Sequence, residues 1–226
     1  MSDTDSFIEE VTEEVRRDRL YGYLKRYGWI AGLVIVLIVG GAGYSEYRRA
    51  QAEAQAEALG DEMLAALSLD DDAGRAAALV AAQADTPQGT AILAFLTAGV
   101  QTEADEIDAA VETLNSIATI PDVPLIYRQI ASFKVLTLQS DTMDAQTRRA
   151  GFESLAVPGV PLRMVAEEQL ALIDIETGNP DAAIERFRRI MDDAEATPGL
   201  QRRALQAIVA LGGALTVDGT SQTPDE

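Results

Sequence analysis

The feature that most constrains this chain is an uncharged stretch of 19 residues, 27–45. At a helical rise of about 1.5 Å per residue, the stretch is roughly 28 Å long, close to the ~30 Å hydrocarbon core of a bilayer. Its β-branched centre at 33–39 resembles a buried strand, but strands usually have only about 5–6 residues. The stretch therefore predicts a membrane-spanning helix over residues 27–47.

The alternative to a permanent anchor is a cleavable signal peptide, because small residues occupy positions 41–43. Signal peptides begin with a short basic region, whereas segment 1–26, which precedes this stretch, is long and carries seven acids. Aromatic side chains also flank the stretch, with Trp29 at one end and Tyr44 and Tyr47 at the other, as in interfacial belts. These features favour an uncleaved anchor.

Basic residues predict the orientation of the anchor. Five precede it and two follow it directly, which favours a cytoplasmic arm at residues 1–26 and an exported C-terminal part. The residues are Arg16, Arg17, Arg19, Lys25 and Arg26 before the anchor, and Arg48 and Arg49 after it.

Glycines gather on one side of the predicted membrane helix. Gly28, Gly32 and Gly43 fall within about 60° of one another on a helical wheel, and Gly40 lies near them. Small residues on one face let a second membrane helix approach closely, so this face is a candidate packing site. The alternative is that glycine is simply common in membrane helices.

Beyond the anchor the sequence predicts only helices. Segment 48–86 is expected to form a helical stalk and a first hairpin, residues 87–214 a helical array, and residues 215–226 a disordered tail. Three aspartates at 70–72 lack the spacing of a calcium loop and are expected to cap the next helix. Proline and glycine separate the later helices, and no alternating strand pattern occurs. The expected helices span residues 46–69, 73–84, 88–101, 106–119, 124–139, 142–156, 162–177, 180–194 and 199–212.

Composition excludes several kinds of chemistry. The chain has no His and no Cys, which removes Ser-His-Asp and Cys-His catalysis and thiolate or imidazole metal sites. Its formal net charge of −19 opposes binding to nucleic acids. Neighbouring carboxylates are expected on solvated helix faces of so acidic a chain. We therefore expect no enzyme, no catalytic residue, no cofactor and no metal site.

An internal repeat organises the C-terminal part. Segment 108–117, DAAVETLNSI, matches segment 181–190, DAAIERFRRI, so that each position of the first segment corresponds to the position numbered 73 higher. Two units of about 34 residues, with slightly longer loops, fill that offset, so one further unit fits between the two segments.

The later segment resembles a tetratricopeptide repeat (TPR). Ala171, Gly178, Ala183 and Phe187 stand at the small, turn, small and large positions of that motif. The earlier copy matches with Ala98, Ala110 and Leu114 but has Asp105 at the turn. In the middle unit Leu136 and Phe152 fit, whereas Arg148 replaces a small residue. Glu167 and Asp174 replace the aromatic residues of the first-helix consensus. The resemblance implies an all-α fold, a single membrane helix followed by a divergent TPR-like helical-hairpin solenoid.

The whole layout resembles the ancillary SecYEG translocon subunit family (YfgM-like) of bacterial inner membranes. The resemblance implies an inner-membrane, single-pass protein with a cytoplasmic N-terminus and a periplasmic domain. Its partners would be the SecYEG translocon, a periplasmic chaperone and exported polypeptides. The alternative is a membrane-anchored TPR scaffold or assembly factor for another envelope complex, in respiratory or cytochrome maturation or in cell division.

The TPR register also predicts a binding groove, because first helices of TPR hairpins line the concave face. It assigns Ile92 and Phe95 to that groove from the first copy, and Glu168, Leu172 and Ile175 from the last. An apolar groove in an acidic surround suits segments that are both apolar and basic. The alternative is that the chain's own stalk or its last helix fills the groove.

Overall fold

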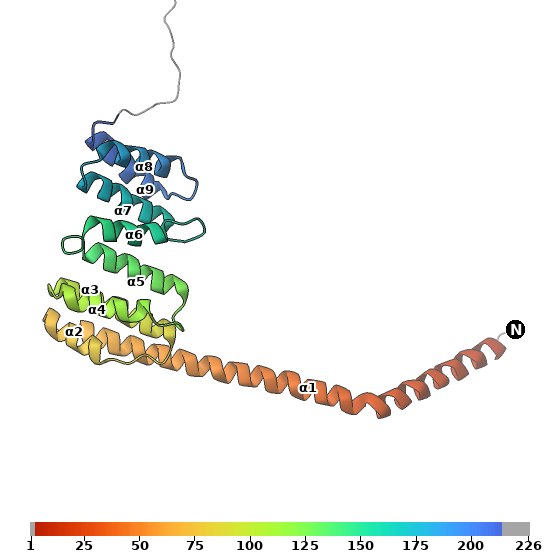
Figure 1. The fold of residues 1–226 in the computed structure, drawn as a ribbon. Helices are drawn as coiled ribbons and strands as arrows, with labels where there is room; N and C mark the ends of the chain where they lie inside the picture. The colour runs from red at the N-terminus through yellow and green to blue at the C-terminus, as the bar shows by residue number, and fades with distance from the viewer. Residues whose placement is uncertain (1–2, 214–226) are drawn as a thin grey trace, which may run out of the picture. The chain divides into compact units, whose positions relative to one another are not determined.

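The structure is a computed structural model that describes the backbone of residues 3–213 and, from residue 26 onward, the side chains apart from those of Tyr27 and Ala31. The predicted tail at 215–226 lies outside the described residues. All elements in the described range are α-helices, which confirms the all-α prediction (Figure 1). They are α1 (Asp3–Leu67), α2 (Asp72–Ala81), α3 (Pro87–Glu103), α4 (Ile107–Ala118), α5 (Leu125–Leu138), α6 (Ala145–Leu155), α7 (Arg163–Glu176), α8 (Pro180–Asp192) and α9 (Pro198–Ala210).

The chain forms two compact units, residues 1–58 and residues 59–226, and helix α1 contributes to both. In the first unit α1 contains a segment that is long and apolar enough to cross a membrane. None of that segment is buried inside the protein, and Val36 and Leu37 are 68% and 65% exposed. A core helix of a soluble domain would be covered instead. Helix α1 ends at Leu67, two residues before the predicted end at residue 69.

Helix boundaries in the second unit follow the caps that the sequence carries. The side chains of Asp71, Thr86, Asp144 and Thr197 each accept a hydrogen bond from a backbone N–H three residues later. Such caps satisfy an amide that the first turn leaves without a partner. The Asp71 carboxylate accepts from the Gly74 N–H at 2.6 Å, so the capping prediction for 70–72 is confirmed. Ends of α2–α9 agree with the predicted ends to within three residues.

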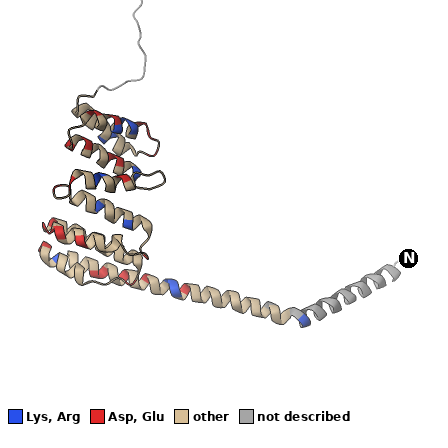
Figure 2. Ribbon diagram, in the orientation of Figure 1, with Lys and Arg blue, Asp and Glu red and all other residues tan. Residues whose placement is uncertain are grey.

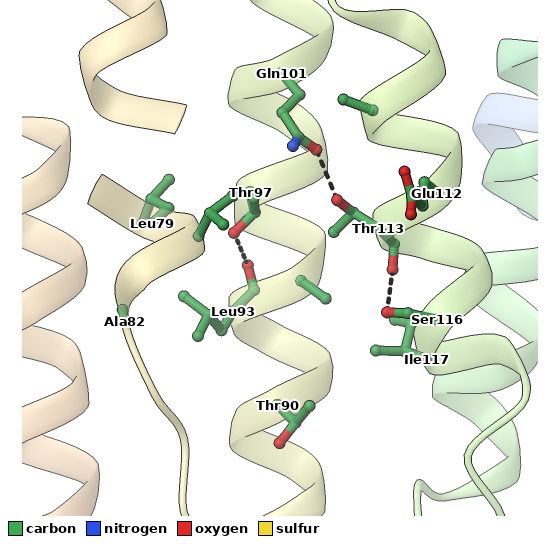
Figure 3. A pocket seen from close by; sticks show the side chains of 13 residues that line it. Leu79, Ala82, Thr90, Leu93, Thr97, Gln101, Glu112, Thr113, Ser116 and Ile117 are labelled. Carbon is green, nitrogen blue, oxygen red and sulfur yellow. Dashed lines mark hydrogen bonds between the residues drawn. The ribbon is translucent and has the colours of Figure 1, made fainter. Parts of the chain in front are cut away.

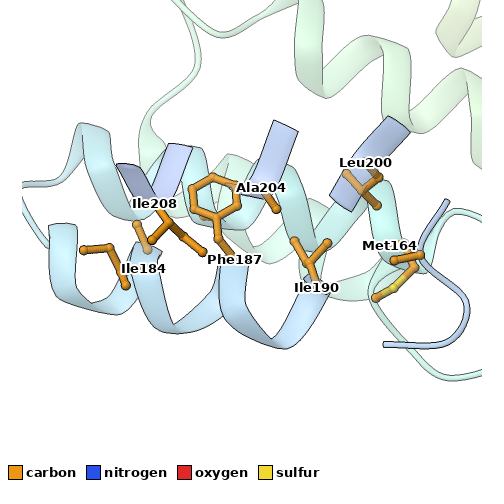
Figure 4. Close-up of a cluster of buried hydrophobic side chains, with 10 residues drawn as sticks. Met164, Ile184, Phe187, Ile190, Leu200, Ala204 and Ile208 are labelled. Atoms are coloured by element: carbon orange, nitrogen blue, oxygen red, sulfur yellow. The ribbon is translucent and has the colours of Figure 1, made fainter. Parts of the chain in front are cut away.

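The second unit is a succession of helical hairpins in which each helix from α2 to α9 contacts the next along the chain. Buried side chains form separate clusters along this succession. The cluster of α7, α8 and α9 is built around Phe187, which is 1% exposed and points its ring toward Ala204 and Ile208 of α9 (Figure 4). Alanines fully buried at the helix crossings, such as Ala91, Ala110 and Ala183, let neighbouring helices approach closely.

The buried core repeats at the same offset as the sequence. We call α2–α5, residues 72–138, the first copy and α6–α9, residues 145–211, the second copy. Buried positions of the α3–α5 cluster coincide with those of the α7–α9 cluster. The pairs are Ala91 and Met164, Ala98 and Ala171, Ala110 and Ala183, Leu114 and Phe187, Ile117 and Ile190, Val123 and Ala196, Ala131 and Ala204, and Val135 and Ile208.

The turn after α3 and the turn after α7 are also equivalent, although one has Asp105 and the other Gly178. Both residues adopt the left-handed conformation, with φ of 62° and 76°. In both turns a backbone N–H bonds back across the helix end at 2.8 Å, from Glu106 to the Gln101 carbonyl and from Asn179 to the Asp174 carbonyl. Aspartate tolerates this conformation better than most residues, so the missing turn glycine does not change the fold here.

Arg148, at the small position of the middle unit, is 5% exposed and does not disrupt the hairpin. Its Nε donates to the Met143 carbonyl at 3.2 Å, and its terminal nitrogen pairs with the Glu176 carboxylate. Gly151 on the same helix allows the close approach of Leu136, because an added Cβ would lie 2.6 Å from a Leu136 methyl group. The α5–α6 hairpin therefore keeps its packing through different residues.

Candidate interaction surfaces

The described part of the chain contains a groove of about 460 Å³ in the first copy, between α2 and α4 and over α3 (Figure 3). Leu79 of α2, Leu93 of α3 and Ile117 of α4 form its apolar floor and are almost fully buried. Three helices form this groove because α3 packs between α2 and α4, contacting both. The groove was not among the sites predicted from the sequence.

Polar groups of the groove are neutral apart from one carboxylate. The Thr113 hydroxyl donates to the side-chain carbonyl of Gln101 at 2.9 Å, which leaves the amide NH₂ of Gln101 as a donor (Figure 3). Thr97 donates to the Leu93 carbonyl at 2.8 Å, so its oxygen keeps accepting capacity. Glu112 is exposed and supplies the only charge among the lining residues. The groove therefore offers apolar contact, amide and hydroxyl groups, and one negative charge.

Larger or charged side chains stand at several equivalent positions of the second copy, although Leu93 corresponds to the smaller Ala166. By the repeat offset, Leu79, Ala94 and Thr97 correspond to Phe152, Glu167 and Leu170, and Gln101 and Thr113 correspond to Asp174 and Arg186. Phe152 and Leu170 are each 1% exposed. The hydrogen bond between Gln101 and Thr113 thus becomes an ion pair between Asp174 and Arg186, with 3.2 Å between the Arg186 Nε and a carboxylate oxygen.

This ion pair belongs to a network that joins α6, α7 and α8. Asp174, only 5% exposed, also pairs with Arg149 at 2.7 Å, and Arg186 also pairs with Glu167 at 2.5 Å. Burial alone would lower the pKa of Arg186, but its hydrogen bonds to Glu167 and Asp174 outweigh that effect and raise it. Ion pairs therefore join α7 to α6 and α8. At the equivalent place in the first copy, the neutral hydrogen bond between Thr113 and Gln101 joins α4 to α3.

A second set of ion pairs lies toward the end of the second copy. Arg163 donates to Asp193 and to Glu195, each at 2.8 Å. Hydrogen bonds to Glu195 and Asp193 raise the pKa of the Arg163 guanidinium. The backbone N–H of Glu195 and then Arg163 lower the pKa of Asp193. Arg203 of α9 pairs with Glu168 of α7 at 2.7 Å, which raises the pKa of Arg203.

Charge divides the second unit into two parts (Figure 2). Residues 59–118, which include the groove, carry eleven carboxylates and one arginine, a net charge of −10. Residues 119–213 carry thirteen carboxylates and ten basic residues, a net charge of −3. The carboxylates of the first part have few basic side chains to pair with, so this part has a strongly negative field.

The five residues of the predicted TPR groove lie on equivalent faces of α3 and α7, and none of them lines the groove of the first copy. Ile92 and Leu172 are 49% and 45% exposed. Phe95 is half-buried, its ring centroid 6.3 Å from that of Tyr127. Ile175 packs against the α7–α9 cluster. Glu168 pairs with Arg203 of the last helix, α9, at 2.7 Å.

The glycines of the predicted membrane face have open space beside them. A Cβ added at Gly28, Gly32, Gly40 or Gly43 would meet no atom within 4 Å in the chain. The structure thus leaves this face free of intramolecular contacts, and its role in packing against another helix stays a prediction.

Within the described residues, no cluster of three or more Asp and Glu side chains could hold a metal ion. Many carboxylates of the second copy instead pair with arginines, as Asp174, Glu176 and Asp193 do.

The sequence did carry a signal for the groove of the first copy. Ala94 and Thr97 of α3 are smaller than Glu167 and Leu170 at the equivalent positions of α7. Smaller side chains at these positions indicate space beside α3 that the side chains of α7 would occupy.

No protein-family model, no curated protein and no solved structure matches this chain.

Proposed function

We propose that this protein is anchored in the bacterial inner membrane by α1 and acts with the Sec translocon, where its helical domain takes part in protein–protein contacts and chaperone-type handling of exported polypeptides. The observation that carries the proposal is the apolar segment of α1, which is exposed along its length and continues as helix into the first hairpin of an acidic helical domain. Such a design couples a membrane partner to a polypeptide-binding domain.

The helical domain is proposed to be a divergent TPR-like, right-handed solenoid. Supporting this assignment, the small positions Ala98, Ala110, Ala171 and Ala183 are at most 3% exposed, and successive helices pack against each other. TPR proteins use such hairpins to present a surface to extended or helical segments. The exposed Ile92 and Leu172 are the apolar side chains that this surface would present from α3 and α7.

Orientation with the helical domain in the periplasm rests on the five basic residues before the anchor against two after it. Exported polypeptides and a periplasmic chaperone are then the partners within reach of the domain. We further propose that the protein binds rather than catalyses, because the chain has no His or Cys and its buried carboxylate, Asp174, is held by two arginines.

Photocrosslinking from the membrane helix tests the proposal. A photoreactive residue at Gly32 is expected to crosslink a translocon subunit, because small residues allow close helix approach. The matched control is the same residue at Val34, which lies on the opposite side of the helix. Crosslinking to a respiratory, cytochrome-maturation or division protein would favour the scaffold function. Extraction of the intact chain by carbonate would contradict the anchor itself.

A further inference from the structure

We propose that the groove of the first copy is a docking site for a peptide segment that is both apolar and basic. This inference deepens the proposed function, on which it rests only for the source of the peptide. It places the docking site on the α2–α3–α4 side of the first copy, lined by Leu79, Thr97, Gln101 and Glu112, and not on the face that carries Ile92 and Phe95.

The groups of the groove match those of a polypeptide. Val80 and Ala82 provide accessible apolar surface for a side chain such as leucine, and Leu79, Leu93 and Ile117 form the buried floor beside them. The free NH₂ of Gln101 can donate to a peptide carbonyl, and the Thr97 oxygen can accept from a peptide N–H. A main chain that enters an apolar groove needs such partners, since an unsatisfied buried amide is costly.

The negative charge around the groove favours basic peptides over acidic ones. Glu112 lies at the groove, and the surrounding residues 59–118 have a net charge of −10. Lysine and arginine beside an apolar residue are therefore attracted, while acidic segments are repelled. A second copy of this chain is a poor occupant for the same reason, because its own net charge is −19.

The second copy provides an internal comparison. Its helices have the same buried frame, but Phe152 and Leu170 replace Leu79 and Thr97, and the ion pair of Arg186 with Glu167 spans α7 and α8 where Ala94 and Thr113 line the groove. The frame of the hairpins therefore accommodates a filled version of this region. The open version in the first copy is a property of its own side chains.

The test transfers the filled version into the first copy. The full-length chain in detergent micelles is titrated with a fluorescent peptide of about twelve residues in which leucine and lysine alternate. When extended, a peptide of this length is long enough to lie along several turns of the helices that line the groove. The variant Leu79→Phe/Thr97→Leu should weaken binding by about tenfold or more, which corresponds to about 1.4 kcal/mol. Unchanged affinity in this variant would overturn the proposal.

Gly99→Leu is the matched control, because it adds a leucine to α3 where a Cβ meets no atom within 4 Å and where the second copy has Leu172. It should leave the affinity within about twofold, a change below roughly 0.5 kcal/mol. Weaker binding in the control but not in the filled variant would place the peptide on the face of Ile92 and Phe95 and overturn the inference.

A second variant keeps the test independent of core packing. Glu112 is exposed, so the Glu112→Lys variant should fold normally. The variant should bind the leucine-lysine peptide more weakly, and added salt should then change the affinity less than it does for the unchanged chain. A peptide of leucine and glutamate should not bind. Equal binding of the two peptides would contradict the charge selection. The crosslink from Gly32 is independent of these outcomes, so failure of the groove and failure of the translocon association can be told apart.

Discussion

The two copies of the helical domain share a buried frame and differ in the polar groups between their helices. Leu114 and Phe187 occupy the same place in the frame, each 1% exposed. Across the neighbouring helix pair, the first copy has the neutral bond between Thr113 and Gln101, and the second has Arg186 between Glu167 and Asp174.

The comparison shows that buried apolar residues stabilise the fold, whereas the polar residues between the helices determine the surface. Eight pairs of buried apolar positions coincide at the repeat offset, so hydrophobic burial sets the arrangement of helices in both copies. The polar positions then vary without changing that arrangement. In this region one copy has ion pairs between its helices, and the other has a groove of about 460 Å³.

The largest expected effect comes from the shared frame. Phe187→Ala in the full-length chain should lower the free energy of unfolding by about 3–5 kcal/mol, because it removes a buried ring and leaves a cavity. Leu114→Ala, the equivalent change in the first copy, should cost about 2–5 kcal/mol. Thermal loss of the helical circular dichroism signal in detergent micelles measures both.

The control for these variants is Leu172→Ala, since Leu172 is 45% exposed and its truncation leaves no cavity. It should shift the melting temperature much less than either core variant. If Phe187→Ala melted at the temperature of the unchanged chain, the equivalence of the two frames would be wrong.

The next effect concerns the polar difference itself. Arg186→Thr alone should cost about 3 kcal/mol, because it leaves Glu167 without its arginine and Asp174 with only one of two partners. Asp174→Gln alone should also destabilise, because Arg186 and Arg149 lose a nearly buried carboxylate. The double variant Asp174→Gln/Arg186→Thr reproduces the pair of the first copy.

A double-mutant cycle gives the coupling between the two residues. The double variant should be more stable than the sum of the single effects implies, by about 0.5–3 kcal/mol, since residues in one network do not act independently. Strictly additive effects would mean that the Asp174–Arg186 contact contributes little, and that the neutral and charged versions differ in shape only.

Local signals in the sequence predicted much of the fold. Thr86 with Pro87 and Thr197 with Pro198 begin their helices where expected, because caps and first-turn prolines act within one turn. The match between the two repeat segments likewise predicted that Ala183 and Phe187 would be buried, which the structure confirms. Asp105 departs from the turn glycine of the motif, yet it adopts a positive φ as Gly178 does.

The surfaces were harder to predict, because they depend on contacts between helices distant in sequence. The pairing of Glu168 with Arg203, 35 residues apart, could not be deduced from spacing within one helix. The groove was missed because Ala94 and Thr97 look like ordinary helix residues unless they are compared with Glu167 and Leu170. Self-comparison of the two copies, and not motif recognition, was the signal available.

The smallest expected effect is a difference in pH dependence between the copies. The pKa of Asp193 lies below its ordinary value of about 3.8, chiefly because its carboxylate accepts a hydrogen bond from the Glu195 N–H and also because it pairs with Arg163. A carboxylate whose pKa is lower when folded stabilises the protein at neutral pH, and that stabilisation is lost as the pH falls through the folded pKa. The Gln101–Thr113 bond of the first copy has no such dependence, since neither group titrates in this range.

Asp193→Asn should therefore lower the melting temperature of the full-length chain at pH 7, and the difference from the unchanged chain should shrink as the pH falls below about 3.8 and approaches the folded pKa. Asp122→Asn, an exposed change in the loop before α5, is the matched control for acid-induced effects elsewhere. Added salt at pH 7 should reduce the difference too, because the Arg163 pairs are partly exposed and are screened. If Asp193→Asn lowered the melting temperature equally at pH 7 and at a pH low enough to protonate the folded Asp193 carboxylate, the effect would come from lost packing or hydrogen-bond geometry. The ion pairs of the second copy would then stabilise the fold through packing and hydrogen-bond geometry and not through charge, as the neutral Gln101–Thr113 bond of the first copy does.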